Sequence, residues 1–157
     1  MATKQSAALL LYRWGEEGLE VLLAHPGGPF WAKKDQGAWS IPKGEFLEEE
    51  EPYVAARREF AEEIGTRVDG EALALTPLKQ PSRKVIHAFA LEHDLNVDKI
   101  ASNTFEMEWP PTSGKTAAFP EVDRAAWFGL SAARKRIQPG QAPILDELVR
   151  RLEAGRP

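Results

Sequence analysis

The sequence contains no cysteine, and this absence excludes several kinds of site at once. Disulfide bonds, thiolate-bound metals and cysteine nucleophiles all need a thiol side chain. Long apolar runs are missing too. The N-terminal run at residues 7–11 is too short for a signal-peptide core, and no segment is long enough to span a membrane. We therefore expect a cytoplasmic protein that has no membrane partner.

A strong excess of charge of one sign is also missing. The 20 basic and 24 acidic residues leave a net charge of −4, which argues against a nucleic-acid polymer as the partner. A small phosphorylated ligand is compatible with this balance, because a bound cation can reverse the local field. With 157 residues, of which 43% are hydrophobic, the chain suits a single domain at residues 1–157, as a monomer or a homodimer.

What is present is a loop followed by an acidic helix. Pro52 suits the first turn of a helix, where its missing N–H is not needed, and Gly65 suits the helix end, where a left-handed residue is common. Between them Tyr53, Phe60 and Ile64 fall on one narrow arc. The spacing predicts a helix that turns this arc towards the core.

Three carboxylates lie on another face of the same helix. Glu59, Glu62 and Glu63 are spaced i, i+3 and i+4, so each pair repels by on the order of 3 kcal/mol at ~6 Å and an effective dielectric of ~20. Mg²⁺ favours a few carboxylates together with phosphate oxygens. The face is either an ordinary solvated surface or a cation site that presents the ion to a phosphate.

The wider pattern around this helix resembles the signature box of the Nudix hydrolases, G-x5-E-x7-R-E-U-x-E-E-x-G-U, in which U is a bulky apolar residue. Seven charged or glycine positions agree within the 23 residues from Gly44 to Thr66. Thr66 departs from the pattern, since an aliphatic residue is usual there, but that position serves packing. The box residues of this chain are Gly44, Glu50, Arg58, Glu59, Phe60, Glu62, Glu63, Gly65 and Thr66.

The resemblance implies an α/β (α+β) fold, namely an α/β/α sandwich with a mixed central sheet. It also implies a hydrolase that uses Mg²⁺ or Mn²⁺ to cleave a nucleoside diphosphate linked to another group. By analogy the small size favours nucleoside triphosphates or dinucleoside polyphosphates, with ADP-ribose and nucleotide sugars also open. The alternative is a catalytically silent domain that senses nucleotides or acts as a scaffold.

The same resemblance implies roles for residues of the box. Glu59 and Glu63 are the expected metal ligands, and Glu62 is a third ligand or the general base. The backbone carbonyl of Lys43 is expected to join the metal shell. Family members differ in where the base lies, so a downstream residue is a second possibility.

Further roles fall on residues around these carboxylates. Arg58 and Glu50 are expected to orient the ligands. Glu121 is the downstream candidate for the general base, and Glu106 and Glu108 are weaker candidates. A glutamate that simply lies in a solvated loop is the competing interpretation of Glu121.

Four positions are interpreted as substrate contacts. Lys43 and Lys84 are placed to meet phosphate, although both also suit an ordinary solvent-exposed lysine, and Gly44 is assigned to the same site. Trp31 either stacks on a base or covers the core. The partner expected from these contacts is a small nucleotide.

Alternation and turn residues predict the remaining elements. A short helix through residue 136 is expected to be capped by Ser131, and an amphipathic helix at residues 142–153 is expected to close the fold. We interpret His25 and His87 as structural, and we expect the strand at residues 84–91 to be central. Strands are predicted at residues 6–12, 18–24, 72–78, 84–91, 103–109 and 125–128.

Overall fold

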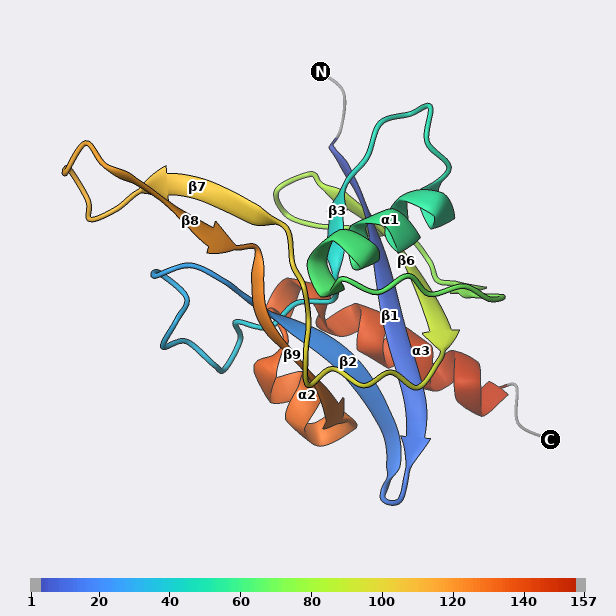
Figure 1. The fold of residues 1–157 in the computed structure, drawn as a ribbon. Coiled ribbons are helices and arrows are strands. Elements are labelled where there is room, and N and C mark those ends of the chain that lie inside the picture. Colours follow the sequence, from blue (N-terminus) through green and yellow to red (C-terminus); the bar gives the residue numbers. More distant parts are fainter. Residues whose placement is uncertain (1–3, 155–157) are drawn as a thin grey trace.

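A computed structural model describes residues 4–154, and within them a seven-stranded sheet lies at the centre of the fold (Figure 1). Its strands are β1 (Gln5–Gly15), β2 (Gly18–Pro26), β3 (Lys43–Glu45), β4 (Leu73–Ala74), β5 (Leu78–Lys79), β6 (Val85–Glu92) and β9 (Val122–Gly129). A separate hairpin is formed by β7 (Thr104–Glu108) and β8 (Thr116–Pro120). The helices are α1 (Pro52–Ile64), α2 (Leu130–Arg136), the 3-10 turn η1 (Pro139–Gln141) and α3 (Ala142–Ala154).

The sheet is mixed. Its main path runs β4–β6–β1–β2–β9, while β3 pairs with β1 and β5 pairs with β6. The β1–β6 pair is parallel, whereas the other pairs are antiparallel. The strands predicted at residues 6–12, 18–24 and 84–91 are confirmed, with β1 and β2 longer than expected.

The sequence of β1 explains the layers. Alternate side chains of a strand point to opposite faces of the sheet, and at residues 7–11 of β1 the apolar side chains of both faces are fully buried. Ala7, Leu9 and Leu11 pack with α1, whereas Ala8 and Leu10 pack with α2 and α3. Helix α1 therefore covers one face and α2 and α3 cover the other, as the predicted α/β/α sandwich requires (Figure 1).

Helix α1 begins and ends where the sequence predicts. Pro52 occupies its first turn, and Gly65 caps its end with a left-handed backbone at φ 87°. Phe60 and Ile64 are buried in the core between α1 and the sheet, and Tyr53 packs against the same core while partly buried. The apolar arc thus fixes which side of α1 is left for the carboxylates.

The second helical layer also follows its sequence pattern. In α3 the side chains of Ile144, Leu145 and Leu148 are buried against the other face of the sheet, which confirms the predicted closing helix. The helix has 13 residues. No helix within residues 4–154 is long and apolar enough to cross a membrane.

Three details differ from the prediction. Two short strands, β4 and β5, take the place of the single strand predicted at residues 72–78, and Pro77, which has no N–H to donate, lies between them. Ser131 does not cap α2, because the helix begins one residue earlier, at Leu130, after an extended Gly129. The centre of the sheet is β1, and β6 lies beside it.

Candidate functional site

Gly44 lies directly against Glu59, where β3 passes the acidic face of α1. A side chain at residue 44 would overlap the Glu59 carboxyl group, so only glycine leaves this space open. Pairing with β1 holds the strand in place, with Gly44 opposite Ala7. The Glu59 side chain is only 12% exposed, so its carboxylate is confined between strand and helix.

Arg58 joins three carboxylates. Its Nε and Nη2 donate a bidentate pair of hydrogen bonds to Glu50, at 2.8 and 2.9 Å. Its Nη1 donates to Glu59 at 2.8 Å and to Glu62 at 3.2 Å. The pKa of Glu50 is lowered because Arg58 donates these hydrogen bonds. One guanidinium group therefore fixes the relative positions of the box carboxylates.

The positive charges of Arg58 and Lys43 only partly balance the carboxylates of Glu59 and Glu63. Burial raises the pKa of Glu63 to about 8, and the charges of Glu59 and Glu121 act in the same direction. A backbone hydrogen bond from Lys43 opposes this shift without cancelling it. Burial also raises the pKa of Glu59, against the hydrogen bond from Arg58. A further cation or a proton is needed to keep these groups buried together.

Glu121 is brought to the box by backbone hydrogen bonds that cross three segments. The Asn103 amide donates to the carbonyl of Glu62 at 2.8 Å, and the Glu121 amide donates to the carbonyl of Asn103 at 2.8 Å. The Gly27 amide then donates to the carbonyl of Glu121 at 2.9 Å. Glu121 is exposed, and partial burial of its carboxyl together with the charge of Glu62 raises its pKa.

The weaker base candidates lie elsewhere on the hairpin. Glu108 accepts hydrogen bonds from the amides of Thr112 and Gly114, at 2.8 and 3.3 Å, so its carboxylate closes the hairpin turn. Glu106 is exposed on β7 and pairs across the hairpin with Ala118. Of the three downstream glutamates, Glu121 is the one whose charge acts on Glu59 and Glu63.

The predicted substrate contacts fall at two places. Lys43 is the first residue of β3, and Lys84 directly precedes β6. Burial lowers the pKa of Lys43, and the charge of Lys84 lowers it further. Lys84 also forms an ion pair with Glu45 at 3.4 Å. Trp31 lies in the loop after β2, where it is 37% exposed and lines a groove together with Glu121.

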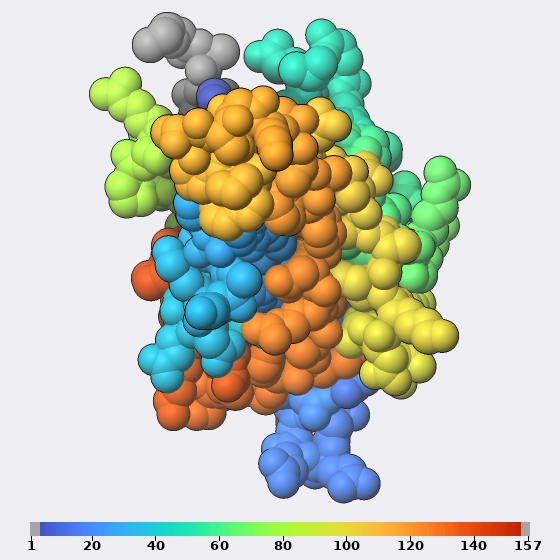
Figure 2. Space-filling model, turned by 60° about the vertical axis from the view of Figure 1, so that its left-hand side comes forward, coloured from blue at the N-terminus to red at the C-terminus, as the bar shows by residue number. Residues whose placement is uncertain are grey.

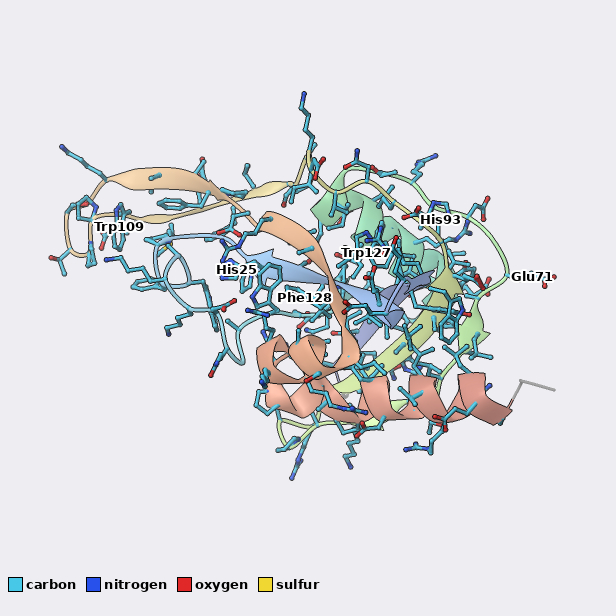
Figure 3. All side chains as sticks on the ribbon, turned by 90° about the horizontal axis from the view of Figure 1, so that it is seen from below. His25, Glu71, His93, Trp109, Trp127 and Phe128 are labelled. Carbon is cyan, nitrogen blue, oxygen red and sulfur yellow. The ribbon has the colours of Figure 1, made fainter. Side chains whose placement is uncertain are left out.

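The two histidines have partners within the protein, as expected of structural residues. His25 is fully buried, with Nδ1 2.8 Å from an Asp123 carboxylate oxygen and Nε2 2.6 Å from the Lys34 carbonyl oxygen (Figure 3). Nε2 of His87 lies 2.6 Å from the side-chain oxygen of Gln5. His25 thus links the loop after β2 to the start of β9.

The donor set suits a hard divalent cation in its chemistry, because carboxylate and carbonyl oxygens are the ligands that Mg²⁺ and Mn²⁺ take. Within residues 4–154, however, no three acidic or histidine side chains already surround a common point at metal distance. Arg58 instead supplies the positive charge next to Glu59 and Glu62.

Two contributions escaped the sequence pattern. Asn103 connects Glu62 to Glu121 through its backbone, and backbone hydrogen bonds leave no trace in residue type. The loop at residues 27–31 meets the β7–β8 hairpin beside Glu121, and these segments are distant in the sequence. The one sequence signal for this meeting was the Gly27-Gly28 pair, because residues without side chains allow other segments to approach closely.

Solved structures share this fold at low sequence identity. The NUDIX domain of Shewanella oneidensis NrtR, complexed with ADP ribose, aligns with a TM-score of 0.67 and 17% identity over 97% of this chain and 90% of that chain. The Ap4A hydrolase of C. elegans, in a binary complex, aligns with a TM-score of 0.65 and 19% identity over 96% and 98%. The E. coli ORF135 protein aligns with a TM-score of 0.55 and 24% identity over 99% and 95%.

No curated protein shows significant sequence similarity to the chain. The family comparison is decisive, because the sequence matches the NUDIX domain over residues 3–148. That match spans nearly the whole chain, includes the complete box and agrees with the fold of the solved structures. The protein is therefore a member of the Nudix family.

Proposed function

We propose that this protein is a metal-dependent hydrolase that cleaves the phosphoanhydride bond of a nucleoside diphosphate linked to another group. The observation that carries the proposal is the gathering of a complete set of box residues around Glu59. Gly44 leaves room for the Glu59 carboxylate, and Arg58 ties it to Glu50 and Glu62. This arrangement offers oxygen ligands and a fixed orientation, which phosphoryl transfer requires.

Each box residue has a proposed task. Glu59 and Glu63 would hold Mg²⁺ or Mn²⁺, with Glu62 or the backbone carbonyl of Lys43 as further ligands. When bound, the cation neutralises the charge of the phosphate oxygens during hydrolysis. The raised pKa values of Glu59 and Glu63, caused by burial and by neighbouring carboxylates, support this assignment, because a bound cation would favour the charged forms. Arg58 and Glu50 orient these carboxylates and do not touch the substrate themselves.

The proton of the attacking water needs an acceptor, and Glu121 is our first choice. Its carboxyl is exposed to solvent, and its pKa is raised by partial burial and by Glu62. The backbone of Asn103 holds Glu121 next to α1. Glu62, which is more exposed than Glu59, is the second choice.

For the substrate we favour nucleoside triphosphates or dinucleoside polyphosphates. The fold shared with the Ap4A hydrolase of C. elegans agrees with this class. Because the NrtR domain binds ADP ribose, ADP-ribose and nucleotide sugars are further candidate substrates. Lys43, Gly44 and Lys84 would lie beside the phosphates, and Trp31 would lie beside the base.

A catalytically silent nucleotide-sensing or scaffolding domain is the second candidate. One observation favours it: Arg58 lies between Glu59 and Glu62, where a cation would otherwise balance their charge. Against it stands the retention of every charged box position. A domain that only binds nucleotides has no physical need for all of these carboxylates.

A substrate panel tests the proposal. Nucleoside triphosphates, dinucleoside polyphosphates, ADP-ribose and nucleotide sugars are each incubated with Mg²⁺, with Mn²⁺ or with chelator, and the products are separated and identified. We expect cation-dependent cleavage of one class at the phosphoanhydride bond. Binding of nucleotides without cleavage under any of these conditions would instead establish the silent domain.

A further inference from the structure

An aromatic groove lies beside Glu121, between the loop after β2 and the β7–β8 hairpin. It has a volume of about 280 Å³. Figure 2 shows the two walls next to each other on one face, the hairpin in orange and the loop in light blue. The groove is lined by Pro26, Gly27, Gly28, Pro29, Phe30, Trp31, Phe105, Met107 and Glu121.

Two glycines allow the loop after β2 to pack closely against the β7–β8 hairpin. A side chain at Gly27 would overlap the carbonyl oxygen of Pro120, and a Cβ at Gly28 would lie 2.9 Å from the ring of Phe105. Gly28 also has φ +97°, which favours glycine. Bare backbone thus brings the loop against the hairpin, and the space between them is built into the fold.

Aromatic rings are presented at this groove instead of being buried. Phe30 is 58% exposed and Trp31 is 37% exposed, which is unusual for large apolar side chains. Phe30 is held by an edge-to-face contact with Trp109, with ring centroids 5.7 Å apart. Exposed rings that are held in place lose little freedom when a flat ligand covers them.

The groove is continuous with the carboxylate site through Glu121. Glu121 lines the groove, and two backbone hydrogen bonds of 2.8 Å join it through Asn103 to Glu62 at the acidic face of α1. A ligand with a flat ring at one end and phosphates at the other would therefore place its ring among apolar side chains and its phosphates beside α1. A nucleotide has this polarity.

We propose that the groove between residues 27–31 and the β7–β8 hairpin binds the nucleobase of the substrate by stacking on Phe30 and Phe105. This inference rests on the proposed function, because it assumes that the phosphates lie at the box carboxylates. Only Trp31 and Glu121 among the nine lining residues carry polar side-chain atoms. Stacking without extensive contact to the base edges tolerates different bases. The groove therefore selects nucleotides over base-free phosphates and discriminates weakly among bases.

Binding can be measured without hydrolysis. The intact protein with Mg²⁺ is titrated calorimetrically with a methylene-bridged ATP analogue, with the corresponding GTP and CTP analogues, and with methylene diphosphonate, which has no base. Variants Phe30→Leu and Phe105→Leu keep apolar bulk and remove the ring, so the hairpin retains its packing. Trp14→Leu removes another exposed aromatic ring, beside the β1–β2 turn, and is the matched control.

We expect the wild-type protein to bind the ATP analogue at least about tenfold more tightly than methylene diphosphonate, with the three analogues within roughly tenfold of one another. Each leucine variant should weaken nucleotide binding by about tenfold, within the range for loss of a base-stacking ring, and should change methylene diphosphonate binding by less than about twofold. Trp14→Leu should bind as the wild type does.

The inference is overturned if both leucine variants retain wild-type affinity for the ATP analogue, or if they lose affinity for methylene diphosphonate to the same extent. Hydrolysis and stacking can fail separately. Cleavage of the substrate panel by a protein whose leucine variants bind normally would sustain the proposed function and remove the base groove. Ring-dependent binding without any cleavage would sustain the base groove and remove the proposed hydrolase function.

Discussion

The bare Cα of Gly44 on β3 faces the carboxylate of Glu59 on α1, and a methyl group there would overlap that carboxylate. The two residues belong to different elements, so strand pairing and helix packing must both be correct for them to meet. Glycine is therefore required at residue 44 because the Glu59 side chain occupies the space that a Cβ would fill. Its backbone has no positive φ that would demand glycine.

This relationship predicts the effect of Gly44→Ala. The added methyl group displaces the end of the Glu59 side chain, which is flexible, so we expect the fold to survive and kcat/KM to fall by roughly tenfold or more. Gly129→Ala is the matched control, because residue 129 has open space around its Cα and no positive φ. Steady-state kinetics and thermal melting of both variants provide the comparison. A wild-type kcat/KM for Gly44→Ala would show that the position of Glu59 does not matter.

Arg58→Lys tests whether the bidentate contact to Glu50 positions the carboxylates. Lysine keeps the positive charge but cannot donate two parallel hydrogen bonds to Glu50 while also reaching Glu59. We expect the affinity for Mn²⁺ to fall by about 10–100-fold, measured by calorimetric titration. An unchanged affinity would show that charge alone suffices at this position. Arg134→Lys, in an exposed ion pair with Asp146, is the control.

Glu63→Gln should change stability in a way that depends on pH. Burial raises the pKa of Glu63 to about 8 in the folded protein, against 4.5 as its ordinary value, so the folded state binds the extra proton between these limits. The contribution of Glu63 to stability therefore falls as pH rises from about 5 to about 8. In chelator, Glu63→Gln should melt at least ~2–4 °C above wild type at about pH 9, and this advantage should shrink at about pH 5. Equal differences at both pH values would contradict the assignment.

Glu121→Gln distinguishes the two candidates for the general base. If Glu121 accepts the proton, the substitution should lower kcat by on the order of 10²–10³-fold with little change in nucleotide affinity. Glu106→Gln, on the exposed side of β7, should leave turnover at the wild-type level. A near-wild-type kcat for Glu121→Gln, with Glu62→Gln inactive, would return the role to the box.

The parts of the site that sequence could predict are local. Pro52, Gly65 and the arc that contains Phe60 define α1 within 14 residues, and the i, i+3, i+4 spacing then places the carboxylates on one face. The same local patterns predict β1, β2, β6 and α3. A regular period that is repeated over several residues leaves little choice of structure.

The parts that sequence missed depend on distant partners. The strand β3 has three residues and no alternation, and it is a strand only because it pairs with β1. The strand β8 contains two adjacent alanines and ends at Pro120, yet it pairs fully with β7. The link from Glu62 through Asn103 to Glu121 runs entirely through backbone groups, which any residue type would offer.

The turnover of wild type and of Glu63→Gln on the best substrate of the panel, with Mg²⁺ and with chelator, shows whether the carboxylates of α1 carry the reaction. We expect Glu63→Gln to lower turnover by on the order of 10³-fold, about 4 kcal/mol in the barrier, while the variant stays folded. Chelator should abolish the activity of the wild type. Full turnover by Glu63→Gln, or cleavage by the wild type that persists in chelator, would contradict a hydrolase built on the carboxylates of α1.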